Sequence, residues 1–114
     1  MEFSCSKTSD LLFVKVLAER IDAVAALEFK DSLREITGKA GANHVILDLS
    51  EVGFIDSSGL GAVVAVMKLM GNTKRLDLAG LTPTVAKVFR LTRMDSIFTI
   101  HDTVDDVTKL YKAG

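Results

Sequence analysis

The feature that most constrains the fold is an apolar segment followed by a polar turn and a second apolar segment. Residues 45–49 read Val-Ile-Leu-Asp-Leu, which has the length and the β-branched content of a buried strand. Residues 60–70 form a largely apolar block that suits a helix, and Asp56 and Ser57 before it are favourable N-cap residues. The sequence therefore predicts a strand, a turn and a helix in succession, with Ser58 at the amino-terminal end of that helix.

Ser58 stands where an added phosphate group would be accommodated. The first turn of a helix carries backbone N–H groups without intrahelical partners, and these groups favour an anion. Gly59, the next residue, removes a side chain at a point where another molecule could approach the backbone closely. We therefore expect Ser58 to be a site for a phosphate.

Strands and helices alternate along the chain. Apolar runs predict strands at residues 3–7, 11–17, 45–49, 76–78 and 97–100, and capping residues predict helices that begin at Asp22, Ser57, Thr82 and Thr103, the first of them closed by Gly38. This alternation favours an α/β fold with one mixed sheet of four or five strands and about four helices packed mainly on one side. The first two strands are close enough in sequence to pair antiparallel. The residues predicted to form the core are Phe29, Leu33, Ile46, Leu47, Val63, Val64 and Met67.

Length and composition limit the class of protein. A chain of 114 residues has room for one core, so we expect a single domain over residues 1–114. The net charge of −1 gives no electrostatic case for binding nucleic acid or an anionic membrane. The longest apolar block, residues 60–70, is too short for insertion across a membrane, and the N-terminus lacks the order of a signal peptide. Together with the single cysteine, Cys5, these features favour a cytoplasmic protein.

The helix predicted over residues 60–70 is apolar on both sides. Helical spacing places Leu60, Val63, Val64, Met67 and Met70 on one face, and Ala62, Ala65, Val66 and Leu69 on the opposite face. A helix of this kind is either enclosed by neighbouring helices or partly exposed for a partner. The second face is thus a candidate docking patch beside Ser58, and both interpretations stay open.

Enzymatic interpretations find little support. A serine hydrolase needs a general base, and the two histidines, His44 and His101, each lie at a predicted strand end without an evident orienting carboxylate motif. The turn does not match Gly-x-Ser-x-Gly, and no Gly-Lys-Ser/Thr triplet of a P-loop occurs. No Cys/His cluster is available for a metal. We therefore expect no catalytic residue, cofactor or metal site.

A receiver domain would instead use Asp56 as its phosphoacceptor. Such a domain needs an acidic pair after its first strand to hold Mg²⁺. Residues 17–20 offer a single carboxylate, that of Glu19, which disfavours this interpretation.

The sequence around the turn resembles a known family. Residues 48–61 read Asp-Leu-Ser-Glu-Val-Gly-Phe-Ile-Asp-Ser-Ser-Gly-Leu-Gly, which looks like the signature of the anti-sigma factor antagonists, the bacterial branch of the STAS domain family. The triplet Arg20-Ile21-Asp22 at the start of the first predicted helix adds to the resemblance, which covers essentially the whole chain. The chain departs from many relatives at Glu19, where they have glycine.

The resemblance implies a partner-switching protein. In that family, the second serine of the Asp-Ser-Ser-Gly turn is phosphorylated by a partner serine kinase, a histidine-kinase-like ATPase that is also the anti-sigma factor, and a serine phosphatase reverses the modification. Carried onto this chain, the phosphorylated residue is Ser58, and release from the kinase follows its phosphorylation. The resemblance also places Asp22 and Asp56 near the phosphorylated serine. The turn and the helix after it add the other expected neighbours and partner contacts, which are Ser57, Gly59, Leu60, Ala62 and Leu69.

A different role within the same family is also open. The chain could serve, without phosphorylation, as a STAS subunit of an ABC-type lipid transport assembly. A neighbouring gene for a histidine-kinase-like ATPase would favour the first role, and genes for an ABC permease and its ATPase would favour the second.

Overall fold

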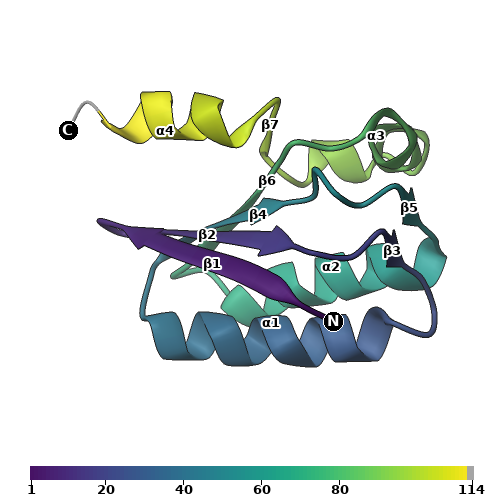
Figure 1. Ribbon diagram of the computed structural model, residues 1–114, viewed down its shortest axis with the longest axis horizontal. Helices are drawn as coiled ribbons and strands as arrows, with labels where there is room; N and C mark the ends of the chain where they lie inside the picture. Colours follow the sequence, from purple (N-terminus) through teal and green to yellow (C-terminus); the bar gives the residue numbers. More distant parts are fainter. Residues whose placement is uncertain (113–114) are drawn as a thin grey trace.

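Five strands form a mixed sheet in the spatial order β1-β2-β4-β6-β7 (Figure 1). The computed structural model describes residues 1–112. The strands of this sheet are β1 (Phe3–Thr8), β2 (Leu11–Val16), β4 (His44–Asp48), β6 (Arg75–Ala79) and β7 (Ile100–His101). Strands β1 and β2 pair antiparallel, and the other neighbours pair parallel. The predicted mixed sheet and its antiparallel first pair are confirmed.

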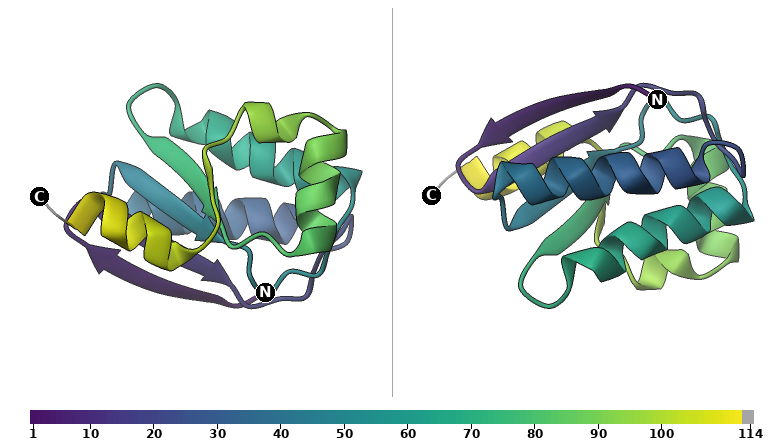
Figure 2. Two further views of the ribbon diagram at one scale, coloured as in Figure 1. Left: turned by 90° about the horizontal axis from the view of Figure 1, so that it is seen from above. Right: turned by 90° about the horizontal axis from the view of Figure 1, so that it is seen from below.

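Four helices surround the sheet. They are α1 (Ala26–Ala40), α2 (Ser57–Met70), α3 (Pro83–Leu91) and α4 (Val104–Lys112), and a short 3₁₀ helix, η1 (Met94–Ser96), follows α3. Helices α1 and α2 lie side by side under one face of the sheet, whereas α4 crosses the opposite face (Figures 1 and 2). Helix α3 lies beyond the carboxyl ends of the parallel strands, close to the amino-terminal end of α2. The predicted architecture is thus confirmed, with α4 as the helix on the second face.

Strand β4 lies at the centre of the fold. Its residues Val45, Ile46 and Leu47 are fully buried because the strand is covered on both faces, as expected for the middle of a parallel sheet. The main core fills the space between the sheet and the first two helices, with Phe29 and Leu33 contributed by α1. A second, smaller cluster lies under α4 and is formed by Ile46, Ala79 and Val107.

A separate two-stranded sheet forms beside the carboxyl ends of the main strands. Strands β3 (Arg20–Ile21) and β5 (Phe54–Ile55) pair parallel, with Ile21 opposite Ile55. Sequence patterns did not predict this pair, since two residues are too short for a periodic signal. The pair brings the residues that follow each strand, Asp22 and Asp56, to the same end of the molecule.

Several predicted boundaries are wrong. Helix α1 begins at Ala26 and not at Asp22, because residues 22–25 form a separate turn in which the Ala25 N–H donates to Asp22. The glycine cap is Gly41, with a φ of 67°, whereas Gly38 lies inside the helix. The last strand is confined to Ile100–His101, because η1 precedes it.

The predicted core is largely confirmed. Phe29, Leu33, Ile46, Leu47 and Val63 are fully buried. The other two predicted core residues, Val64 and Met67 of α2, are only half-buried and pack at the edge of the core. Within residues 1–112, no helix combines the length and the hydrophobicity needed to cross a membrane.

Candidate functional site

The turn between β5 and α2 is held by the carboxylate of Asp56. This residue is the N-cap of α2: its Oδ1 accepts a hydrogen bond from the Gly59 N–H at 2.8 Å. Its Oδ2 accepts from the Ala23 N–H at 3.0 Å, which ties the turn before α1 to the first turn of α2. Both oxygens of Asp56 therefore have a structural task, and the predicted N-cap is confirmed.

Gly59 is required by the packing of α2 on β3. A Cβ atom at this position would lie 1.8 Å from the carbonyl oxygen of Ile21, far inside van der Waals contact. The sequence suggested that another molecule approaches the backbone at this glycine, but the approaching backbone belongs to the same chain. Gly61, by contrast, has no neighbouring atom within 4 Å of an added Cβ and faces open space.

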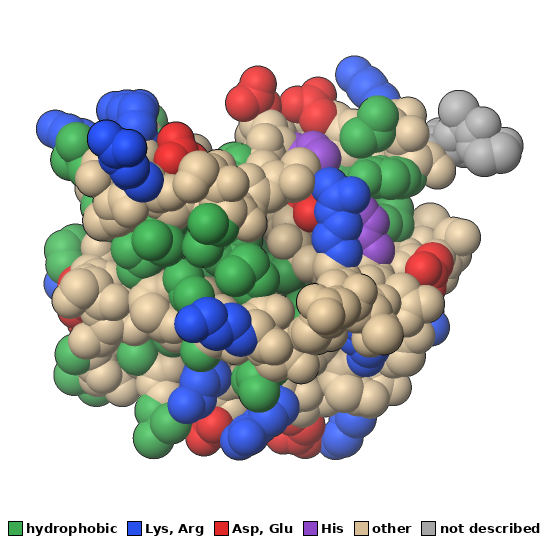
Figure 3. Space-filling view, turned by 180° about the vertical axis from the view of Figure 1, so that it is seen from behind, with side chains coloured by type: hydrophobic (Ala, Val, Ile, Leu, Met, Phe, Trp, Pro, Cys, Tyr) green, Lys and Arg blue, Asp and Glu red, His purple; other side chains and the backbone are tan. Residues whose placement is uncertain are grey.

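The two serines of the turn are both exposed, but they line different hollows. Ser57 lines a hollow of about 550 Å³ between α2 and α3, whose other walls include Val64, Val88 and Met94. We call it the α2/α3 hollow; it is seen as the recessed apolar area on the back of the molecule in Figure 3. Ser58 lines the α1/α2 hollow, of about 370 Å³, together with Lys30. A modification on one serine would thus fill a different surface from a modification on the other.

Of the two interpretations of the second face of α2, enclosure by a neighbouring helix holds for most of its residues. Ala62 and Val66 are 7% and 1% exposed, respectively, because α1 packs against that side of the helix. Leu69 belongs to the same face and is 53% exposed, so among the large side chains of this face it alone reaches the surface. The apolar surface next to the turn lies instead on the side of Val64, in the α2/α3 hollow.

Asp22 contributes a second carboxylate at this end of the molecule. Its Oδ1 accepts from the Ala25 N–H at 3.2 Å, and the Arg20 guanidinium lies 3.4 Å from its Oδ2. The Ala25 N–H and, to a smaller extent, Arg20 hold the pKa of Asp22 below its usual range, although burial acts in the opposite direction. The guanidinium also stacks over the Phe54 ring, 4.1 Å from its centroid. Asp22 is therefore ionised and already engaged.

The remaining predicted contact, Leu60, is only 7% exposed and lies at the floor of the α2/α3 hollow. Sequence reasoning missed Lys30, which is far from the turn in the chain and is brought to it by the packing of α1 on α2. The only feature of the sequence that could have indicated Lys30 is its position on the helix that follows Asp22.

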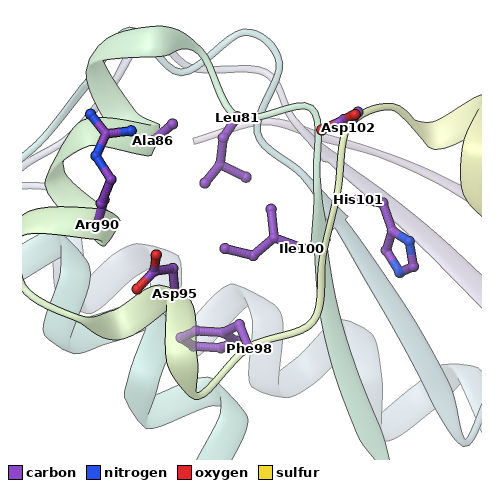
Figure 4. A pocket seen from close by; sticks show the side chains of 8 residues that line it. All are labelled: Leu81, Ala86, Arg90, Asp95, Phe98, Ile100, His101 and Asp102. Atoms are coloured by element: carbon purple, nitrogen blue, oxygen red, sulfur yellow. The ribbon is translucent and has the colours of Figure 1, made fainter.

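A third hollow lies on the other side of α3. It has a volume of about 380 Å³, an apolar floor formed by Leu81, Phe98 and Ile100, and charged side chains at its rim, among them Arg90 and Asp95 (Figure 4). None of the predicted site residues lines it. Across residues 1–112, no group of three or more His, Cys, Asp or Glu residues is arranged to hold a metal ion.

Comparison with known proteins gives consistent results. The family model described as the STAS domain matches residues 6–107. The anti-sigma-B factor antagonist of Listeria monocytogenes is 34% identical over 85 residues, which cover 74% of this chain and 74% of that protein. An anti-sigma factor antagonist from Mycobacterium paratuberculosis has a crystal structure that superposes with a TM-score of 0.84 at 22% identity, covering 97% of this chain and 93% of the other.

The same fold also occurs within a transporter. The structure of mouse Solute Carrier 26 family member A9, an anion transporter, superposes with a TM-score of 0.81 at 14% identity. The match covers 96% of this chain but only 19% of the transporter. The shared fold alone therefore does not separate the two roles considered for the sequence.

Proposed function

The chain belongs to the STAS domain family, and from that premise we propose that it is an anti-sigma factor antagonist controlled by phosphorylation of Ser58. In its unphosphorylated form it binds an anti-sigma factor serine kinase of the histidine-kinase-like ATPase type and thereby frees the sigma factor. Phosphorylation of Ser58 releases it, and a serine phosphatase restores the binding form. The STAS domain extends over residues 1–114, and the protein acts in the cytoplasm as a binding module and not as an enzyme.

The observation that carries this proposal is the setting of Ser58. Its side chain is exposed in the first turn of α2, and within residues 1–112 no group forms a hydrogen bond with its hydroxyl. The capping task that a serine often performs at a helix start is taken by Asp56. The Ser58 hydroxyl is therefore free to serve as a phosphate acceptor.

The structure around Ser58 favours a switch that acts at an interface. A phosphate adds about −1.5 to −2 charges, and the helix start offsets this by roughly 0.3–1 kcal/mol. The carboxylates of Asp22 and Asp56 act in the opposite direction, so the local terms partly cancel. Since both carboxylates keep their own hydrogen bonds, we expect the phosphate to cause little change in the fold. Release therefore arises where the partner must desolvate the phosphate.

The surface that the partner covers surrounds the start of α2. The α1/α2 hollow and the α2/α3 hollow lie on its two sides, and exposed apolar side chains adjoin the first of them, with Val24 93% and Leu27 64% exposed. Ser57 and Asp22 belong to this surface, and Leu69 lies further along α2. Asp56, Gly59, Leu60 and Ala62 support the surface from within the fold.

The test is to map the phosphate. The protein is incubated with ATP and each purified histidine-kinase-like ATPase encoded in the same genome, and the modified residue is identified by mass spectrometry of its peptides. The expected product is phosphoserine at position 58 in the wild-type protein and in Ser57→Ala, and no product in Ser58→Ala. Phosphate on Ser57, or on neither serine, would contradict the proposal. Absence of phosphate together with co-purification of an ABC permease and its ATPase would instead indicate the transport-assembly role.

A further inference from the structure

The α1/α2 hollow contains one cation that has no ion-pair partner among the residues that the structure describes. Lys30 is half-buried on α1 and is the only charged side chain among the residues that line this hollow. The wall across from it is formed by Ser58 and by small residues of α2. Two other lysines, Lys15 and Lys39, form salt bridges, with Glu51 at 3.1 Å and Glu35 at 2.8 Å. Within residues 1–112, the Lys30 ammonium group forms no such bond.

We propose that Lys30 is the electrostatic partner of the phosphate on Ser58, and that the two close the α1/α2 hollow in the phosphorylated protein. The inference rests on the proposed function, which supplies the phosphate. The hollow, of about 370 Å³, has room for a phosphate group on the serine that lines it. Filling it removes one of the two surfaces offered to the kinase. Phosphorylation then acts through Lys30 as well as through the charge presented to the partner.

The neighbouring acidic groups do not compete for Lys30. Asp31, next to it on α1, forms a salt bridge with Arg34 at 3.0 Å. Beside the start of α2, Asp56 accepts two backbone N–H groups, and Asp22 is engaged with a backbone N–H and with Arg20. Lys30 is therefore the cation that remains for a new anion at this place.

The experiment measures the ionisation of the phosphate itself. Phosphoserine is introduced at position 58 by suppression of an amber codon, and its second pKa, near 6 in a free chain, is followed by ³¹P NMR titration. A lysine within about 4–6 Å favours the dianion, so the pKa in the wild-type background is expected to lie about half a unit or more below that in Lys30→Gln. Lys30→Arg is expected to retain the low value, and the difference is expected to shrink as salt is added.

Lys68→Gln is the matched control, since Lys68 lies on α2 and lines the other hollow. It is expected to leave the phosphoserine pKa nearly unchanged. An unchanged pKa in Lys30→Gln, or an equal change in both lysine variants, would overturn the proposal. Should Lys30→Gln fail to fold by circular dichroism, Lys30→Met keeps the apolar stem and takes its place.

The two proposals fail separately in these experiments. Because the phosphoserine is introduced during translation, the titration is independent of any kinase. Phosphate mapped to Ser57 would contradict the proposed function, while the titration would still decide the role of Lys30.

Discussion

Arg75 donates a hydrogen bond from Nε to the Oδ1 atom of Asp77 at 2.7 Å, which joins a half-exposed guanidinium to a carboxylate that is only 1% exposed. The other oxygen of Asp77 lies 3.0 Å from His44 Nε2 and 2.9 Å from His101 Nε2. The His44 ring also makes an edge contact with Tyr111 of α4, at 5.1 Å between centroids. The buried carboxylate therefore connects β4, β6 and β7 and supports α4.

This cluster predicts an acid-sensitive contribution to stability. Burial raises the pKa of Asp77, but the hydrogen bonds from His101, Arg75 and His44 outweigh it and hold the pKa below its usual value. A carboxyl with a lowered folded-state pKa stabilises the fold above its unfolded pKa, about 3.9, and this contribution is lost as the pH falls through the folded value. We expect the free energy of unfolding to fall as the pH is lowered from about 5 to 3.

The variant Asp77→Asn tests this origin. An amide presents an NH₂ group to one of the donors, so we expect a loss of about 1.5–3 kcal/mol at pH 7 and a weaker pH dependence below pH 5 in urea unfolding. Asp95→Asn is the control, since Asp95 is exposed and has no ion-pair partner within residues 1–112. If the free energy of unfolding of Asp77→Asn still falls steeply below pH 5, the acid sensitivity arises from other carboxyl groups.

Two glycines of α2 are expected to respond in opposite ways to alanine. Gly59→Ala places a methyl group against the Ile21 carbonyl, and relief requires a shift of β3 or of α2, at a cost of about 1–3 kcal/mol or more. Gly61→Ala meets no neighbour and removes the entropic penalty of glycine in a helix, so it is expected to stabilise by about 0.5–1 kcal/mol. Thermal unfolding of both variants measures the difference in stability. Equal effects on stability would show that the contact with the Ile21 carbonyl does not require glycine at position 59.

The strand and turn that position the site could be predicted because their signals are local. The apolar run of β4 is long enough to identify a buried strand, and Asp56 caps α2 through a residue only three positions away. The C-terminal boundary of α1 could not be predicted from the sequence, because Gly38 and Gly41 are both suitable helix-capping residues. Only the backbone conformation shows that Gly41 is the cap.

The faces of α2 show the limit of periodicity. Spacing separates its apolar residues into two sides, but it does not say which side α1 covers. The packing of α1 decides that Ala62 and Val66 are buried and that Val64 lines a hollow. The hydrogen-bond partners of Asp77 could not be predicted for a similar reason, since His44 and His101 come from strands far from Asp77 in the sequence.

The central position of β4 predicts a large effect of truncation there. Leu47 is fully buried between α-helical layers, and Leu47→Ala is expected to cost about 2–5 kcal/mol in urea unfolding. Leu69→Ala, at a site that is 53% exposed, is expected to change stability by less than about 0.5 kcal/mol. A change below about 1 kcal/mol for Leu47→Ala would show that β4 carries less of the core than its burial indicates.

The switch predicts a change in affinity without a change in fold. A partner surface shaped for the Ser58 hydroxyl must desolvate any charge placed there, and a loss of about 3 kcal/mol weakens binding more than a hundredfold. Ser58→Asp is therefore expected to bind the kinase at least a hundredfold more weakly than wild type in calorimetry, whereas Ser58→Ala binds as tightly and stays bound in the presence of ATP. Because the Asp56 and Asp22 contacts are unaffected, the melting temperatures of both variants are expected to stay within a few degrees of wild type. Equal affinity of Ser58→Asp and wild type would mean that the interface does not include this turn, and that release has another cause.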